Sequence, residues 1–432
     1  MSDAADEALG SSTRGSRPYL VLIALVVGLL AGVLARGLGD GVREPVLQAA
    51  NMVGGIWLDA LKMTVIPLIV ALLIVGIAQG AEAARAGRIA GRSILWFVIV
   101  CTSSAILGAV LMPMLTSAFP LPEAAGQALR NGLASIDQSA APPPTPGVMD
   151  FFRGVVPSNV VAAASNGDVL PLVVFTVLFG LALSQIIERR RRAVVGLMEG
   201  VADALLVLIG WVLWIAPLGV FALGFALGAS AGGAAFAGLI HYIVLISLVG
   251  VVVTVAGYPI GILAGRVPPG RFARALLPPQ SVAISTRSSL ASLPAMLGAS
   301  RELGVREQVS DVSLPMAVAL FRATGPAMNV AVAFYVASWL GYHPTMGQAI
   351  AATAVASVIS YGAVSLPGEV SFIASIAPVA MALGVPVAPL ALLVAVEMVP
   401  DIIRTLGNVT MDVAVTSAVD RSVGTGSETQ PD

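Results

Sequence analysis

Eight long hydrophobic segments constrain the fold of this chain more than any other feature. A helix needs roughly 20 apolar residues to cross the hydrocarbon core of a bilayer, and each segment reaches that length. Only 11% of all residues are charged, against about 25% in a typical soluble domain. Lipid must therefore be the solvent for much of the chain, which predicts an all-α polytopic membrane protein. The segments lie at about 19–38, 46–79, 90–118, 168–187, 194–228, 238–265, 310–341 and 386–417.

Two further apolar stretches, 270–307 and 345–384, are interrupted in the middle by serine, glycine and proline. Neither half of either stretch is long enough to span comfortably, so each stretch predicts a helical hairpin that enters the membrane and returns. Irregular backbone at that depth is tolerated only inside protein or beside a water-filled cavity. Paired interrupted segments of this kind are typical of transport sites.

Arginines are concentrated in alternate connections between the segments, which by the positive-inside rule face the cytoplasm. We therefore expect a protein of the cell membrane (inner or plasma membrane) with both termini in the cytoplasm. The connection 119–167 is expected outside, and the polar tails 1–18 and 418–432 are expected to be disordered. The arginine-rich positions are 14 and 17, 85–92, 189–192 and 266–274.

Several classes of function are excluded by composition. The net charge of −1 provides no basic field for nucleic acid. The single cysteine, Cys101, cannot form a disulfide within the chain, and His241 and His343 are too far apart in sequence for a metal motif. Ser289 has no histidine in a plausible catalytic triad. We expect no enzyme activity and no organic cofactor.

The last hydrophobic segment contains a row of polar residues that cannot face lipid. Glu397, Asp401, Arg404, Asn408 and Asp412 follow one another at intervals of 4, 3, 4 and 4, which places them on one face of a helix. An arginine can bind a carboxylate through two parallel hydrogen bonds, and an aspartate one turn away can accept from an ammonium group. The oxygens near Asn408 and Asp412 suit Na⁺ or a proton. The alternative is an ion ladder that only holds helices together.

Other segments add polar groups that could face the same cavity. Arg322 precedes a Thr-Gly-Pro sequence that should loosen the seventh segment and free backbone carbonyls. The first hairpin carries Arg287, Ser288 and Ser289 near its tip, and the second carries Glu369. For Arg287 the alternative is a charge that faces the cytoplasm.

The order of these segments resembles the dicarboxylate/amino acid:cation symporter family, the homologues of glutamate transporters. The resemblance covers about residues 19–417. It is carried by LKMTVIPLIVALLIVGI, GWVLWIAPLGVFAL, TRSSLASLP, the LPG of SLPGEV and DIIRTLGNVTMD.

The resemblance implies eight transmembrane helices plus two re-entrant hairpins, a homotrimer and an elevator mechanism gated by the second hairpin. Scaffold helices would lie at 19–86 and within 119–237. The transport domain would comprise 87–118 and 238–417, with the hairpins at 270–307 and 345–384.

The resemblance also implies roles for single residues. Arg404 falls at the position that pairs with the substrate carboxylate, and Asp401 at the position that binds the amino group. Thr405 and Asn408 fall at further substrate contacts, and Asp412 at a sodium ligand. Ser288, Ser289 and the tip at Pro367–Gly368 would close over the ligand.

The sequence departs from the family pattern in the seventh segment. The family signature Asn-Met-Asp-Gly-Thr falls at 321–325, where this chain reads Phe-Arg-Ala-Thr-Gly. Two sodium ligands are thereby lost, and the threonine that contacts substrate becomes Gly325. Phe97, Val100 and Cys101 fall where the third segment should supply oxygen ligands to a second sodium ion. Leu290 and Glu369 replace small residues of the two hairpins.

We therefore expect a secondary active transporter that couples a small anionic solute, an acidic amino acid or a C4-dicarboxylate, to Na⁺ or H⁺. One alternative is a sodium-independent or proton-coupled carrier in which Arg322 replaces a bound cation by offsetting Asp412 or Asp401. In that case Glu397 and Glu369 would carry protons. Arg322 could instead serve as a second anchor for a dianion. Further alternatives are an anion channel on the same scaffold and a homologue that does not transport.

Overall fold

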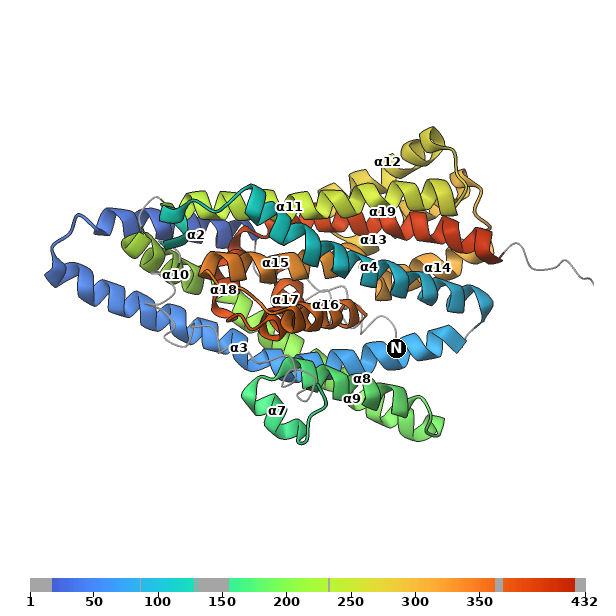
Figure 1. The fold of residues 1–432 in the computed structure, drawn as a ribbon, viewed down its shortest axis with the longest axis horizontal. Coiled ribbons are helices and arrows are strands. Elements are labelled where there is room, and N and C mark those ends of the chain that lie inside the picture. The colour runs from blue at the N-terminus through green and yellow to red at the C-terminus, as the bar shows by residue number, and fades with distance from the viewer. Residues whose placement is uncertain are drawn as a thin grey trace, which may run out of the picture.

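The computed structural model describes residues 18–85, 87–127, 130, 155–231, 234–361 and 368–423, and within them regular structure is entirely helical. This confirms the all-helical prediction for the described residues. Figure 1 shows α2 (Pro18–Ala35), α3 (Asp40–Arg85), α4 (Arg88–Ala118), α7 (Val160–Asn166), α8 (Val169–Leu183), α9 (Glu188–Trp214), α10 (Ala216–Ala231), α11 (Ala234–Pro259), α12 (Pro269–Thr286), α13 (Ser289–Leu303), α14 (Glu307–Leu320), α15 (Thr324–Leu340), α16 (Met346–Ile359), α17 (Gly368–Leu383), α18 (Ala388–Leu393) and α19 (Met398–Val423). A π-helical turn, Ile260–Ala264, follows α11, and a 3₁₀ turn, Val394–Val396, precedes α19.

Five stretches of the described residues are long and apolar enough to cross a membrane: 41–82, 88–118, 188–214, 236–264 and 307–340. Shorter apolar helices lie at 20–35, 169–183, 216–229, 346–359 and 371–383. The expected total of eight spans and two hairpins stays a prediction. Some boundaries differ from expectation. α7 forms inside the connection 119–167, and α19 continues to Val423, so the tail boundary expected at 418 is too early.

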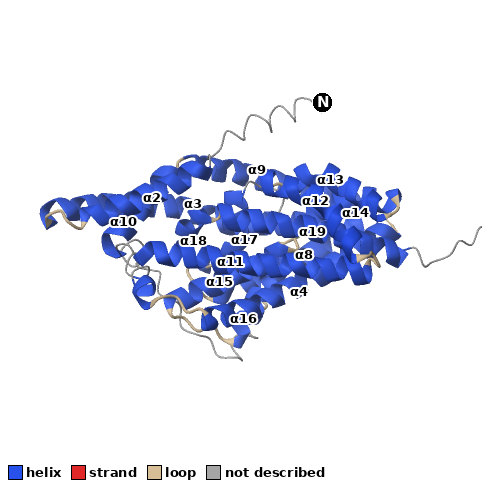
Figure 2. Cartoon of the chain, turned by 90° about the horizontal axis from the view of Figure 1, so that it is seen from above, coloured by secondary structure: helices blue, strands red, loops and turns tan. Residues whose placement is uncertain are grey.

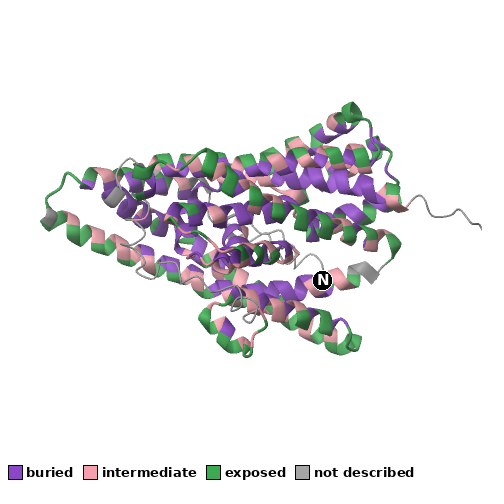
Figure 3. Cartoon of the chain, viewed as in Figure 1, coloured by how far each residue is buried: buried purple, intermediate pink, exposed green. Residues whose placement is uncertain are grey.

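The helices form two groups by their contacts. The first group comprises α2, α3, α8, α9 and α10, with α10 packed along α2 and α9 along α3. The second group comprises α4 and α11 to α19, with α15 against α4 and α19 against α11 and α12. Figure 2 shows this all-helical assembly from above. The core of the second group is α15 and α19, which are buried along most of their length (Figure 3).

The backbones of α2 and α10 touch because glycines face each other across the contact. A Cβ added to Gly228 would lie 2.2 Å from the carbonyl oxygen of Leu29, and one added to Gly32 would lie 2.2 Å from that of Phe225. Small residues permit such close approach between helices where lipid supplies no hydrophobic driving force. The contact therefore depends on the absence of side chains at these positions.

We expect Gly228→Ala to destabilise the protein by about 1–3 kcal/mol, because the added methyl must push two backbones apart. Thermal unfolding of the purified protein in detergent would measure the effect. Gly55→Ala on α3 is a matched control, since nothing lies within 4 Å of a Cβ at that position. Equal unfolding midpoints for the two variants would contradict the close α2–α10 contact.

Two breaks bring irregular backbone to the side of α19. Between α12 and α13 the chain turns at Arg287, whose φ of 53° is left-handed and unusual for a residue other than glycine. α12 and α13 lie side by side, as do α16 and α17. The segment expected as one span at 310–341 is divided into α14 and α15 at residues 321–323, just before the Thr-Gly-Pro sequence.

Candidate binding site

Arg404 on α19 lies at the centre of a buried polar network. Its Nη2 donates to Glu397 Oε1 at 2.7 Å, and its Nη1 donates to Asn329 Oδ1 at 2.8 Å. Glu397 is only 3% exposed and accepts a second hydrogen bond, from the Tyr242 hydroxyl at 3.1 Å. The guanidinium is thus held by groups from α15 and from the turn before α19, and it still has N–H groups that these bonds do not use.

Asp401 pairs with the tip of the first helix pair. Arg287 Nη1 lies 3.5 Å from Asp401 Oδ2, and both side chains are mostly buried. The Thr405 hydroxyl donates to the backbone carbonyl of Asp401 at 2.9 Å. Arg287 is therefore the ion-pair partner of Asp401, and the pair joins the α12–α13 tip to the first turn of α19.

Asp412 is the most isolated carboxylate of the row. It is 1% exposed, and neither of its oxygens accepts a hydrogen bond from the described part of the chain. Arg322, in the break between α14 and α15, attracts this carboxylate electrostatically. A buried carboxylate whose oxygens lack donors is suited to a cation, so Asp412 can hold either an ion or the Arg322 charge.

Asn408 ties α19 to the break between α14 and α15. Its Oδ1 accepts a hydrogen bond from the backbone N–H of Thr324 at 3.0 Å and lies 2.7 Å from the Thr324 hydroxyl. The same hydroxyl lies 2.8 Å from the carbonyl oxygen of Arg404. The geometry of the break is therefore fixed by the helix that carries the charged row.

An apolar cluster fills the space between α4 and this break. The rings of Phe97 and Phe321 stack with their centroids 4.5 Å apart and their planes within 10° of parallel. Both rings are fully buried, as are Cys101 and Ala323. The Tyr361 hydroxyl, at the end of α16, donates to the carbonyl oxygen of Phe97 at 3.4 Å. The side chains of Phe97, Phe321, Cys101 and Ala323 carry no oxygen that could bind a sodium ion.

The remaining predicted site residues lie at helix starts. Ser288 caps α13 by accepting from the backbone N–H of Ala291, and Ser289 is the first residue of that helix. Among the described residues a Cβ at Gly325 would meet Arg322 and Ser360 at 3.5 and 3.7 Å, which is ordinary van der Waals contact, so a methyl group would fit there. Gly368 and Glu369 begin α17, but the Glu369 side chain and all of Pro367 lie outside the described residues.

Sequence reasoning missed Asn329 and Tyr242. Both come from segments other than the one with the charged row, so no spacing rule links them to Arg404 or Glu397. The available signal was weak: Asn329 is a single amide in the apolar sequence of α15, and it is 2% exposed. Buried side-chain amides are usually hydrogen-bonded to another polar group of the protein.

We expect Tyr242→Phe to destabilise the protein by about 1.5–3 kcal/mol, because the lost hydrogen bond goes to a carboxylate. Tyr342→Phe is the matched control, since the Tyr342 hydroxyl accepts from the neutral Gln348 amide at 2.6 Å. Thermal unfolding in detergent would compare the two variants. An effect of Tyr242→Phe no larger than that of the control would contradict the link to an ionised Glu397.

Comparison with known families covers nearly the whole chain, because residues 18–422 match the sodium:dicarboxylate symporter family. The chain belongs to this family. It is 28% identical over 411 residues to the proton/glutamate-aspartate symporter of Escherichia coli (strain K12), covering 91% of this chain and 90% of that protein. It is 26% identical over 416 residues to the C4-dicarboxylate transport protein of Laribacter hongkongensis (strain HLHK9), covering 93% and 88%. A proton/sodium-glutamate symport protein of Bacillus subtilis (strain 168) is 28% identical over 401 residues, covering 90% and 89%.

Membership of the sodium:dicarboxylate symporter family confirms the family resemblance seen in the sequence. Members of this family are transporters, which confirms that the chain is not an enzyme. Together with the long apolar helices, membership makes this chain a multi-pass membrane protein.

Proposed function

We propose that this protein is a cation-coupled symporter for a small carboxylate solute, an acidic amino acid or a C4-dicarboxylate. The observation that carries the proposal is the Arg404 guanidinium, which is held in place by hydrogen bonds to Glu397 and Asn329. One turn away on the same helix, Asp401 is paired with the tip between α12 and α13. A guanidinium fixed in a dry site is well suited to bidentate recognition of a carboxylate. The names of the E. coli and L. hongkongensis relatives fit both solute classes.

In this proposal each polar group near Arg404 has a role. Arg404 binds one carboxylate of the solute, and Asp401 binds its amino group or shares a proton with it. Thr405 and Asn408 complete the contacts from α19. Ser288 and Ser289 from one tip, and Pro367–Gly368 from the other, close over the solute.

The coupling ion binds near Asp412, and fewer sodium ions are used than the family pattern implies. Two observations support this part of the proposal. The positions of Phe97 and Phe321, which the resemblance assigns to sodium ligands, form a buried aromatic stack. Arg322, in the break at residues 321–323, is a cation of the chain itself that attracts the Asp412 carboxylate. Glu397, which is 3% exposed, is then one candidate proton carrier, and we propose Glu369 as the second.

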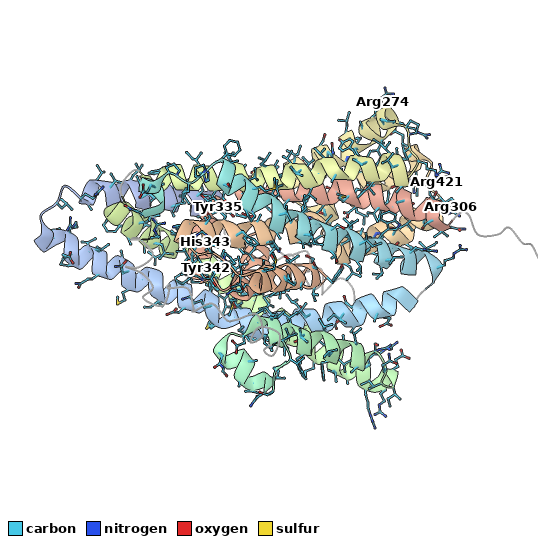
Figure 4. The ribbon with its side chains drawn as sticks, viewed as in Figure 1. Arg274, Arg306, Tyr335, Tyr342, His343 and Arg421 are labelled. Carbon is cyan, nitrogen blue, oxygen red and sulfur yellow. The ribbon has the colours of Figure 1, made fainter. Side chains whose placement is uncertain are left out.

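We also propose the family architecture of eight transmembrane helices, two re-entrant hairpins, a homotrimer and an elevator movement. The division of contacts into two helix groups supports a scaffold and a transport domain. Placement in the plasma membrane with cytoplasmic termini is supported by arginines at one end of the molecule. Arg274, Arg306 and Arg421 lie together at that end (Figure 4), where α19 also ends.

The decisive experiment is a binding assay with purified protein against acidic amino acids and C4-dicarboxylates, with sodium and pH varied. We expect binding of at least one solute of these classes. We also expect the affinity to depend on the cation concentration with a low Hill coefficient. Uptake into proteoliposomes with and without a sodium gradient would complete the test. Failure of the whole panel to bind would contradict the proposed substrate class, and a steep, multi-ion sodium dependence would contradict the role of Arg322.

A further inference from the structure

His241, near the start of α11, contacts two other helices through its imidazole ring. Its Nε2 lies 3.0 Å from the carbonyl oxygen of Phe119, the residue that ends α4. Its Nδ1 lies 3.1 Å from the hydroxyl of Tyr335 on α15, and that hydroxyl donates to the carbonyl oxygen of Gly238 at 3.0 Å. Tyr335 lies in the half of the molecule remote from the labelled arginines (Figure 4). One residue of α11 therefore connects the end of α4 to α15.

These three contacts can be made together only if both ring nitrogens of His241 carry a hydrogen. A carbonyl oxygen only accepts, so Nε2 must donate to Phe119. The Tyr335 hydroxyl has one hydrogen, which goes to Gly238, so Nδ1 must donate to the Tyr335 oxygen. A neutral imidazole has a single N–H and satisfies two of the three contacts, whereas the protonated ring satisfies all three.

The end of α4 also favours a cation at this position. Phe119 is the C-cap of α4, and the carbonyl groups at the C-terminus of a helix carry partial negative charge that attracts a cation. The sequences of α10, α11 and α15 contain no aspartate, glutamate, lysine or arginine. The charged residues of α4 are Arg88 and Arg92, at its other end. The helices around the imidazole thus place no arginine or lysine beside it that would oppose its protonation.

Other titratable and charged groups reach this region from farther away. The Tyr335 ring meets the Tyr242 ring edge to face, with centroids 5.4 Å apart, and the Tyr242 hydroxyl donates to Glu397, the partner of Arg404. In the connection after α4, Glu123 is exposed, and Arg130 donates to a backbone carbonyl near the end of α15. α12 contacts the π-helical turn at the far end of α11, and Arg274 of α12 lies remote from Tyr335 (Figure 4).

We infer that His241 is a proton-binding site, separate from the carboxylates of α19, and that its proton ties the end of α4 to α11 and α15. When the proton leaves, one contact is lost: Nε2 keeps its hydrogen for Phe119, and the Tyr335 hydroxyl turns from Gly238 to Nδ1. Histidine changes charge between about pH 5 and 8. The protonated ring makes the larger number of bonds in the folded state, so the tie stabilises the protein most at acidic pH and weakens as the pH rises.

Thermal unfolding in detergent at about pH 5.5 and about pH 8.5 tests this inference. His241→Gln retains an N–H donor and an oxygen acceptor but cannot bind a proton. At the lower pH we expect its unfolding midpoint to lie about 1–3 °C below that of the wild-type protein, and at the higher pH we expect at least half of that difference to vanish. A midpoint difference that is the same at both pH values would overturn the inference.

The other histidine of the chain provides a matched control. His343 is exposed, so His343→Gln should follow the wild-type midpoint at both pH values. Tyr335→Phe removes the oxygen that Nδ1 donates to, so it should also lose stability mainly at the lower pH. A larger loss of stability for Tyr335→Phe at the higher pH would contradict the tie.

A measurement on the wild-type protein decides the question if His241→Gln does not fold. The chain has two histidines, so nuclear magnetic resonance of protein with isotope-labelled histidine gives two sets of ring signals, which His343→Gln assigns. At about pH 5.5 both ring N–H groups of His241 should exchange slowly with water, because both are hydrogen-bonded, while those of His343 exchange fast. A His241 ring that has a single N–H at this pH, or that exchanges as fast as His343, would overturn the inference.

Discussion

Arg404→Ala is expected to weaken the binding of acidic amino acids or C4-dicarboxylates by at least about 100-fold, or about 3 kcal/mol. The variant removes the guanidinium that would bind the solute carboxylate. It also leaves Glu397, which is 3% exposed, without its ion-pair partner. Truncation of one member of a desolvated charge pair typically costs 2–5 kcal/mol. Titration calorimetry with the purified protein would measure the change in affinity.

Arg301→Ala serves as the control for the loss of an arginine, because both members of the Arg301–Glu307 pair are exposed. The double variant Arg404→Ala/Glu397→Gln separates binding from folding. It should recover thermal stability, since no buried charge is left unpaired, yet still fail to bind. Wild-type affinity in Arg404→Ala would show that the charged row is an ion ladder and not a binding site.

Asp412→Asn is expected to abolish the dependence of solute binding on its coupling cation and to destabilise the protein. The carboxylate is buried without hydrogen-bond donors from the described residues, and its loss removes one charge that attracts Arg322. We expect a loss of stability of about 0.5–3 kcal/mol, the range of the interaction energy between coupled side chains. Binding titrations at several sodium concentrations and pH values, with thermal unfolding in detergent, would measure both effects.

The double variant Asp412→Asn/Arg322→Met distinguishes the two roles of Asp412. An Asp412 that mainly balances Arg322 predicts that the double variant recovers most of the lost stability, with a coupling of about 1–3 kcal/mol between the sites. Additive losses would indicate instead that the two side chains act independently and that Asp412 serves the cation alone. Ser417→Ala, farther along α19, is a control for polar loss on the same helix, because its hydroxyl donates to the carbonyl oxygen of Val413 one turn earlier at 2.9 Å.

Much of the candidate site followed from the spacing of residues on one helix. The intervals between Glu397 and Asp412 predicted a common face, and Arg404 and Asn408 are both hydrogen-bonded to residues of α15. The Thr-Gly-Pro sequence correctly predicted a loosened helix at 321–323. Such features are local, because helix periodicity and turn chemistry act over a few residues.

The partners of these residues could not be predicted in the same way. Tyr242 lies 155 residues from Glu397, and Asn329 lies 75 residues from Arg404. The stack of Phe97 on Phe321 joins α4 to the break between α14 and α15, and neither periodicity nor composition predicts that contact. The pairing of apolar helix faces is decided by packing in three dimensions. It cannot be predicted from the sequence here, because many helices of this chain have apolar faces of similar composition.

The ion pair between Glu397 and Arg404 limits the affinity of the Arg404 guanidinium for a solute carboxylate. A solute carboxylate must share the guanidinium with the Glu397 carboxylate or displace it. The net binding free energy is therefore the difference between two similar ion pairs. This competition keeps the affinity of the site for its solute moderate and the release of the solute fast, as a transporter requires.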